Sequence, residues 1–168
     1  MNFEQQFREK KLQVRLIQKQ KKHFLDLLLL GDEQEEMVAR YLDLGDLWVV
    51  FGAQRAVAVA VVITREDGVC ELKNMAVEPS FQNQGLGSLL LNYLCEQYRR
   101  KCHTMYVGTG ETVKTMHFYE KNGFVFSHRI PNFFLENYDH LIIEDGVLLS
   151  DMVYFKRRLK TATFENKK

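Results

Sequence analysis

The glycine-containing segment that joins one predicted strand to one predicted helix constrains the fold of this chain more than any other feature. The strand covers residues 69–77 and is rich in apolar residues, and the helix covers residues 85–100 with leucines recurring on one face. Gly85 and Gly87 stand at the junction, where a residue without a Cβ atom lets the backbone approach a ligand closely. The first N–H groups of a helix and the helix dipole favour anions, so the junction is a candidate phosphate site.

Neither standard nucleotide motif fits this junction. A dinucleotide fingerprint of the form G-x-G-x-x-G needs a third glycine, and Leu90 stands in its place. No Walker lysine follows the glycines, and no pair of metal-binding carboxylates accompanies them. A nucleotide-dependent transferase is therefore disfavoured, while phosphate binding itself remains the expectation.

The other predicted elements place this unit in a mixed sheet. Alternating or β-branched apolar residues predict further strands at 12–17, 47–51, 56–64, 104–107, 124–128 and 152–156. Helices are predicted from the first strand to about residue 30, from 33 to 44 with Asp32 as N-cap, and from 111 to 122. This order predicts an α/β (α+β) fold with a mixed, mostly antiparallel central sheet flanked by helices.

The strand at 69–77 carries an irregular apolar pattern. Cys70 and Leu72 have one parity, whereas Met75 and Val77 have the other. An extra residue near positions 73–74 would bring both pairs to one face, so a β-bulge is predicted there. A strand buried on both faces would explain the same pattern equally well.

Length and composition narrow the class of protein. The 168 residues, 46% hydrophobic and 27% charged, predict a single domain over 1–168, with loose segments at 1–11 and 161–168. A net charge of +1 does not favour a nucleic-acid partner. The longest apolar run, Ala56–Ile63, is far short of the roughly 20 residues of a membrane helix. Since the N-terminus has no signal-peptide pattern, we expect a cytoplasmic protein without a membrane partner.

The cysteines and histidines do not indicate a metal site. Cys70, Cys95 and Cys102 cannot all pair and form no C-x-x-C motif, so small buried apolar residues are the simpler interpretation. The five histidines show no spacing typical of metal ligands. We therefore expect no metal.

Two motifs resemble those of a known family. The run Met75-Ala76-Val77-Glu78-Pro79, followed by Gln82-x-x-Gly85-x-Gly87, resembles the signature segment of the GNAT superfamily of N-acetyltransferases. His117–Phe124 is similar to the helix and strand that follow it, and the resemblance keeps its order from about residue 12 to 158. The ending Asp151-Met152-Val153 is similar to that of a bacterial subgroup whose acceptors are often unassigned. The resemblance implies a GNAT-like acyl-CoA-binding fold, acetyl-CoA as co-substrate and an amine acceptor, either a small molecule or a peptide.

The same resemblance implies which residues hold the co-substrate. Backbone groups of the segment Met75, Ala76 and Val77 would hold the acetyl carbonyl and the pantetheine arm. Backbone N–H groups of the next segment would bind the pyrophosphate, with Gln82 opening the loop that continues through Gln84, Gly85, Leu86, Gly87 and Ser88. Glu111 stands where many relatives have an asparagine that helps to hold the cofactor, so the sequence departs from the pattern there.

Two residues match catalytic positions. Tyr119 matches the tyrosine that commonly protonates the departing thiolate, and a structural tyrosine packed under the sheet is the alternative. Glu71 matches the glutamate that serves as base in the histone-acetylating branch, and a solvent-facing strand carboxylate is its alternative. Glu144 or an ordered water could instead accept the proton of the amine.

The acceptor is suggested only by charge. In the resembled family the acceptor groove is built by segments that correspond to residues 18–45 and 130–147, and both segments are rich in acids here. Carboxylates around a cleft attract cations, which favours a small cationic amine, although acids are also ordinary solvated surface. A non-catalytic acyl-CoA-binding module would be indicated by loss of the tyrosine or the glycines, and neither is lost. The family resemblance is also compatible with a homodimer.

Overall fold

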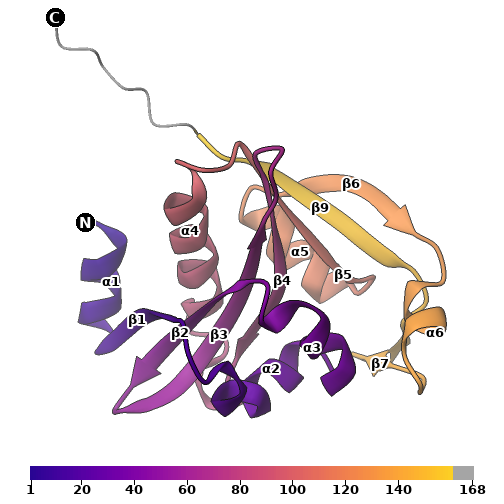
Figure 1. The fold of residues 1–168 in the computed structure, drawn as a ribbon, viewed down its shortest axis with the longest axis horizontal. Coiled ribbons are helices and arrows are strands. Elements are labelled where there is room, and N and C mark those ends of the chain that lie inside the picture. The colour runs from indigo at the N-terminus through magenta and orange to yellow at the C-terminus, as the bar shows by residue number, and fades with distance from the viewer. Residues whose placement is uncertain (161–168) are drawn as a thin grey trace, which may run out of the picture. The chain divides into compact units, whose positions relative to one another are not determined.

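The computed structural model describes residues 1–160 (Figure 1). In the first half of the chain the elements are α1 Phe3–Glu9, β1 Leu12–Ile17, η1 Lys21–Phe24, α2 Leu25–Gly31, α3 Glu35–Leu42, β2 Asp46–Gly52, β3 Arg55–Thr64, β4 Val69–Val77 and η2 Pro79–Phe81. In the second half they are α4 Leu86–Tyr98, β5 Thr104–Gly110, α5 Val113–Lys121, β6 Val125–Ile130, α6 Phe133–Asn137, β7 Ile143–Glu144, β8 Val147–Leu148 and β9 Met152–Arg158.

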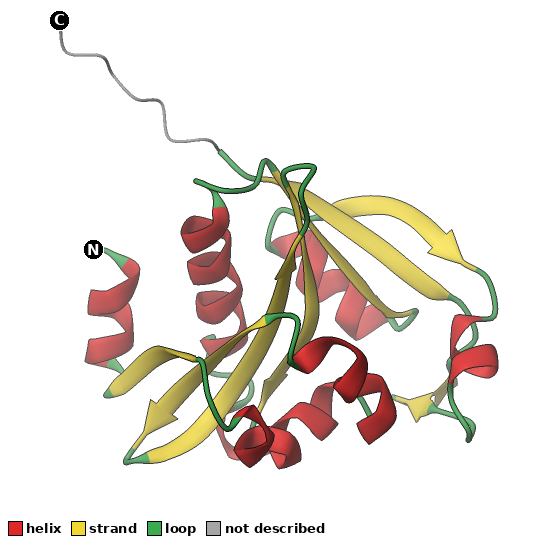
Figure 2. Cartoon of the chain, in the orientation of Figure 1, coloured by secondary structure: helices red, strands yellow, loops and turns green. Residues whose placement is uncertain are grey.

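Seven strands form the main sheet, in the order β1-β2-β3-β4-β5-β9-β6 (Figure 2). The pairs β1–β2, β2–β3, β5–β9 and β6–β9 are antiparallel, which confirms the predicted mostly antiparallel sheet. The last strand within residues 1–160, β9, lies between β5 and β6. A second sheet contains only β7 and β8.

The chain divides into two compact units. The first unit contains residues 1–63 and 72–91, and the second contains residues 64–71 and those from Asn92 onward. β4 belongs to both, because residues 69–71 lie in the second unit and residues 72–77 in the first. The expectation of a single domain over 1–168 stays a prediction.

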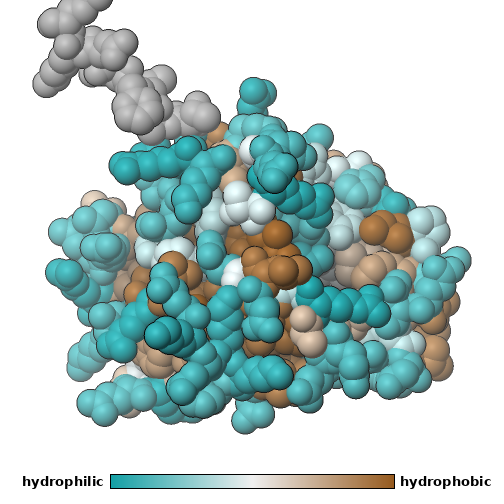
Figure 3. Space-filling view, in the orientation of Figure 1, coloured by the Kyte–Doolittle hydropathy of each residue, from teal (hydrophilic) through white to brown (hydrophobic). Residues whose placement is uncertain are grey.

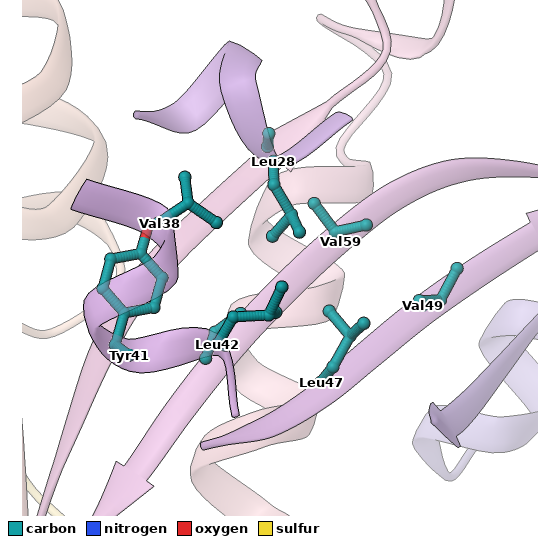
Figure 4. Packing of buried hydrophobic residues seen from close by; sticks show 9 residues of the cluster. Leu28, Val38, Tyr41, Leu42, Leu47, Val49 and Val59 are labelled. Atoms are coloured by element: carbon teal, nitrogen blue, oxygen red, sulfur yellow. The ribbon is translucent and has the colours of Figure 1, made fainter. Parts of the chain in front are cut away.

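The core of the first unit forms where α2 and α3 pack on β2 and β3 (Figure 4). Its helical members are Leu28, Val38, Tyr41 and Leu42, and its strand members include Leu47, Val49 and Val59. Burial of each such aliphatic side chain contributes about 1.5–3 kcal/mol. All residues of β3 from Val57 to Val62 are buried, so this strand lies in the interior on both faces and shows a continuous apolar run.

Residues 3–9 are helical, which corrects the expectation of a loose segment over 1–11. Phe7 of α1 is only 1% exposed, so burial of an aromatic ring anchors the helix. A capping box closes its start: the Gln5 N–H donates to Asn2 Oδ1 at 2.8 Å, and the Asn2 N–H donates to Gln5 Oε1 at 3.0 Å. Residues 161–168, also expected to be loose, lie outside the described residues.

The prediction that Asp32 caps a helix was wrong. α3 begins at Glu35 after Gln34, and Asp32 follows the last residue of α2. Its Oδ2 accepts a hydrogen bond of 3.0 Å from the phenol of Tyr41 instead. An unpaired buried hydroxyl destabilises the fold more than an uncapped but exposed helix start does. The carboxylate therefore binds the Tyr41 hydroxyl.

The second unit is built on β5 and β9. Met105 and Val107 of β5 and Val153 and Phe155 of β9 are buried. Cys70, Cys95 and Cys102 are buried free thiols, which confirms their interpretation as small apolar residues. Among the helices of residues 1–160, none is long and apolar enough to cross a membrane.

Apolar side chains reach the surface around α6, β7 and β8, where Figure 3 shows brown atoms at the right edge. The large exposed apolar residues of this segment are Leu135, Leu141, Ile143, Val147 and Leu148. A segment singled out in the sequence for its acids therefore also exposes large apolar side chains.

Candidate active site

The end of β4 in the first unit carries the residues predicted to hold the acetyl group. Asn74 and Ala76 are buried, whereas Met75 and Val77 are only partly buried. Three consecutive residues of the same strand, Cys70, Glu71 and Leu72, are also buried, so β4 is covered on both faces there. A bulge near residues 73–74 stays a prediction.

The segment after β4 is held by its own side-chain amides. Gln82 Nε2 donates to the Val77 carbonyl at 2.9 Å, and Gln84 Nε2 donates to the Ser80 carbonyl at 3.1 Å. Asn83 and Gly85 both have positive φ, +60° and +80°. Apart from its two chain neighbours, no described residue has an atom within 4 Å of the place where a Gly85 Cβ would stand, so the backbone conformation and not crowding accounts for this glycine.

Helix α4 starts directly after this turn. The Leu89 N–H donates to the Gly85 carbonyl at 3.0 Å, which is the first helical hydrogen bond, so the N–H groups of Leu86 and Gly87 point out of the helix start. Lys10, at the end of α1, adds a positive charge, because its Nζ donates to the Gln84 carbonyl at 3.3 Å. The turn therefore presents N–H donors, a helix dipole and a cation, an arrangement suited to a phosphate group.

Glu71 lies in the second unit and is 4% exposed, which excludes the alternative of a solvent-facing carboxylate. Its Oε2 accepts from Arg65 Nη2 at 2.5 Å, and its Oε1 accepts from the Tyr154 hydroxyl at 3.0 Å. Buried carboxylates need such partners, because an unpaired buried charge strongly destabilises a fold.

Tyr154 was not recognised in the sequence as a residue of the site. It stacks on His128 with ring centroids 4.6 Å apart, and Tyr106 contacts the same histidine edge-on at 6.3 Å. Burial, followed by the charge and hydrogen bond of Glu71, raises the pKa of the Tyr154 phenol. Nothing in the neighbouring sequence distinguishes Tyr154 from other strand tyrosines, because tyrosine is also common in strands that carry no functional site.

Tyr119 of α5 is buried among aromatic rings. Phe118, Phe124 and Phe155 lie around it, with ring centroids at 5.1, 5.7 and 6.2 Å. Burial raises the pKa of its phenol, and the carboxylate of Glu144 raises it further. The packing expected of a structural tyrosine and the protonated phenol expected of an acid are thus both present.

Glu144, the alternative base, lies in the neighbourhood of Tyr119 and Gly110. A Cβ atom added to Gly110 would stand 3.2 Å from Glu144 Oε2. The second unit therefore brings Glu144 to the candidate acid Tyr119, and brings Tyr154 and Arg65 to the candidate base Glu71.

Glu111, predicted to contact the co-substrate, forms a bidentate ion pair. Both of its carboxylate oxygens accept from the guanidinium of Arg129, which also lies 3.7 Å from Asp151 Oδ2. The hydrogen bond from Arg129 lowers the pKa of Glu111. A role in holding the co-substrate stays a prediction for Glu111, whose carboxylate already has a strong partner.

No group of three histidine, cysteine or acidic side chains within residues 1–160 is arranged to hold a metal ion.

Comparison with known proteins identifies the family. Residues 43–126 match the model of the acetyltransferase (GNAT) domain. The chain belongs to the GNAT family of acetyltransferases. The matched residues include β4, the turn with Gly85 and α4, which are the elements that carried the resemblance in the sequence. Both the resemblance and the prediction of an acyltransferase are confirmed.

GNAT relatives match along most of the chain. The uncharacterised N-acetyltransferase YvbK of Bacillus subtilis is 30% identical over 145 residues, which are 85% of this chain and 94% of YvbK. A GNAT acetyltransferase of Elizabethkingia anophelis with acetyl-CoA bound is 29% identical, with a TM-score of 0.84 over 89% of this chain and 99% of that one. A Bacillus subtilis acetyltransferase in complex with CoA is 30% identical, with a TM-score of 0.82 over 89% and 100%. The predicted GNAT-like fold is confirmed.

Proposed function

We propose that this protein transfers the acetyl group of acetyl-CoA to a primary amine, with a small cationic amine as the favoured acceptor. One observation carries the proposal: the turn between β4 and α4 presents helix-start N–H groups and Lys10 in a chain that belongs to the GNAT family. The similar structures that hold acetyl-CoA and CoA support the same co-substrate.

The turn and the strand before it would hold different parts of acetyl-CoA. The pyrophosphate would lie on the backbone N–H groups from Gln84 to Ser88. The pantetheine arm and the acetyl carbonyl would lie along the backbone from Met75 to Val77, where the side chains of Met75 and Val77 are partly buried. A backbone N–H that points at the carbonyl oxygen would stabilise the negative charge that develops there during attack.

The reaction is a direct displacement. The lone pair of a neutral amine attacks the carbonyl carbon, a C–N bond forms, the C–S bond breaks, and the thiolate accepts a proton. The amine must lose its own proton to a base, because alkyl ammonium groups have pKa values near 10. Glu71 is the proposed base and Glu144 its alternative. Both are carboxylates, and they differ in burial: Glu71 is buried, with Arg65 and Tyr154 as hydrogen-bond donors, whereas Glu144 is exposed.

Tyr119 would supply the proton to the thiolate. Its raised pKa keeps the phenol protonated at any physiological pH, so the proton is available whenever the thiolate forms. The ring is held between aromatic neighbours, which fixes the direction of its hydroxyl group.

The preference for a cationic acceptor is supported by exposed acids in each unit. The first unit exposes Glu33, Glu35, Glu36 and Asp43, and the second exposes Glu136, Glu144 and Asp145. Carboxylates in these segments would attract a cation at long range. The apolar side chains of α6, β7 and β8 would suit the aliphatic stem of such an amine.

A screen for thiol release tests the function. The purified protein would be mixed with acetyl-CoA and with spermidine, an aminoglycoside, a lysine peptide or a neutral amino acid, at two salt concentrations. We expect thiol release that depends on the amine and falls with salt for cationic acceptors. A preference for neutral acceptors would contradict the cationic class. Stabilisation by acetyl-CoA without release from any amine would indicate a binding module instead.

A further inference from the structure

A buried polar cluster joins β4 to the two helices that cover it in the first unit. Asn74 is 4% exposed, and its Nδ2 donates to the Leu28 carbonyl of α2 at 2.8 Å and to the Tyr41 hydroxyl of α3 at 3.0 Å. The Tyr41 hydroxyl in turn donates to Asp32 at 3.0 Å. One amide group therefore connects the strand to both helices.

The end of α2 lies directly on the same point of β4. A Cβ atom on Gly31 would collide with the Asn74 side chain and would stand 3.2 Å from the Met75 carbonyl oxygen. Gly31 is the last residue of α2 and has a helical backbone, so close approach accounts for the glycine. Helix α2 thus lies against both the Asn74 side chain and the Met75 carbonyl.

The Asn74 amide combines two satisfied donor contacts with one unpaired acceptor. Its Oδ1 is buried and has no hydrogen-bond partner among residues 1–160, and such an unpaired acceptor destabilises a fold by about 1–3 kcal/mol. The two hydrogen bonds donated by Nδ2 hold the amide in place, and they join this point of β4 to both helices.

We propose that Asn74 is a positioning residue for the reaction: its amide fixes the peptide group between Asn74 and Met75, so that the Met75 N–H points at the acetyl carbonyl. This inference rests on the proposed function, which places the carbonyl at that backbone. Fixed donors stabilise a developing oxyanion because they need not reorient during the reaction.

The mechanism follows from the hydrogen bonds. The Nδ2 atom is held by two acceptors from different helices, so the side chain cannot rotate without breaking one of these bonds. The peptide group that follows Asn74 is therefore restricted through its own Cα atom, and Gly31 restricts the next carbonyl. Burial raises the pKa of the Tyr41 phenol, so its hydroxyl remains a donor to Asp32 and an acceptor for Asn74.

The test compares carbonyl polarisation with affinity. Acetyl-CoA labelled at its acetyl carbonyl would be bound to the wild type and to Asn74→Ala, and the infrared stretch of the carbonyl and the dissociation constant would be measured. We expect the wild type to lower the stretching frequency. Asn74→Ala should lose most of that shift, while its dissociation constant changes less than about threefold because the pyrophosphate contacts remain. Turnover with an amine from the screen should fall about 10- to 100-fold, the typical loss for a misplaced group.

Val38→Ala is the matched control. Val38 belongs to the same core and is 1% exposed, so its truncation removes packing from α3 while the amide hydrogen bonds remain. It should lower the melting temperature and leave the carbonyl shift unchanged. Tyr41→Phe removes one of the two acceptors of Nδ2 and should give an intermediate shift.

The outcomes are distinguishable. A wild-type carbonyl shift in folded Asn74→Ala, or an equal loss in Val38→Ala, overturns the positioning role. If Asn74→Ala does not fold, Tyr41→Phe and Asn74→Asp decide the question by the same two measurements, and an unchanged shift in both overturns it. Absence of acetyl-CoA binding or of any shift in the wild type would count against the proposed function itself.

Discussion

The Tyr154 hydroxyl donates a hydrogen bond of 3.0 Å to Oε1 of Glu71, across 83 positions of sequence. Gly108 makes this contact possible: it pairs with Tyr154 between β5 and β9, and a Cβ atom there would stand 2.8 Å from the tyrosine ring. The candidate base is therefore held in a defined orientation by a side chain from another strand, with Arg65 on its second oxygen.

Exchange of the two candidate bases tests this arrangement. We expect Glu71→Gln to slow the acetylation of high-pKa amines by about 10²–10⁴-fold, because the amine then loses its proton acceptor. Glu144→Gln is the control, since it removes a carboxylate near Tyr119 and leaves Glu71 in place. A wild-type rate in Glu71→Gln, together with a comparable loss of rate in Glu144→Gln, would assign the base to Glu144.

Tyr119→Phe should lower kcat and leave the affinity for acetyl-CoA nearly unchanged. The phenol acts only when charge develops on sulfur, so its loss affects the transition state and not the bound ground state. Because burial and Glu144 raise the pKa of Tyr119 above its ordinary value, its ionisation should produce no alkaline limb below about pH 10. Full activity of Tyr119→Phe between pH 6 and 9 would leave the tyrosine a purely structural role.

The same shift predicts the sign of a stability effect. Below the pKa of an unfolded tyrosine, about 10, the phenol is neutral in both states and pH has no effect through it. Above that value the unfolded chain loses the proton first, so the free energy of unfolding falls as the pH rises. Urea unfolding at several alkaline pH values should show a smaller fall in Tyr119→Phe than in the wild type, and an equal fall would contradict the raised pKa.

Gly85→Ala should weaken the stabilisation by acetyl-CoA. The wild type should gain about 2.7 kcal/mol at 100 times the dissociation constant, which a melting curve detects readily. Alanine at a φ of +80° is strained, by roughly 1–2 kcal/mol, and would distort the turn that presents the N–H groups.

Gly146→Ala is the matched control for Gly85→Ala. Gly146 has a φ of +75° and, like Gly85, no described residue other than its two chain neighbours within 4 Å of the place where a Cβ would stand. Its substitution should lower the melting temperature by a similar amount and retain the full shift with acetyl-CoA. If acetyl-CoA raises the melting temperature of both variants equally, the turn does not contribute to co-substrate binding.

Lys10→Glu should weaken binding of acetyl-CoA several-fold and reduce its dependence on salt. The Lys10 ammonium lies on the Gln84 carbonyl, at the edge of the proposed pyrophosphate site, and a carboxylate there would repel the phosphates. Lys11→Glu makes the same change in net charge at the neighbouring position and should have a smaller effect. Equal effects of both substitutions in a titration would indicate bulk electrostatics and no local contact.

Local features of the fold were predictable because they depend on neighbouring residues in the chain. The strand 69–77 was predicted with the bounds that β4 has, and the helix after it was predicted as 85–100 where α4 covers Leu86–Tyr98. Gly85 was singled out as a backbone position, and its positive φ agrees with that interpretation. Strand alternation, helix periodicity and glycine conformations are all short-range effects.

Partners distant in sequence could be determined only by the tertiary structure. The insertion of β9 between β5 and β6, the hydrogen bond from Tyr154 to Glu71, and the contact of Gly31 with Asn74 join segments with no local sign of one another. Asp32 shows the difference: its sequence position favours a helix cap, yet it binds the buried Tyr41. Such choices follow from which polar groups become buried together, because a buried donor or acceptor must find a partner wherever the fold brings one within reach.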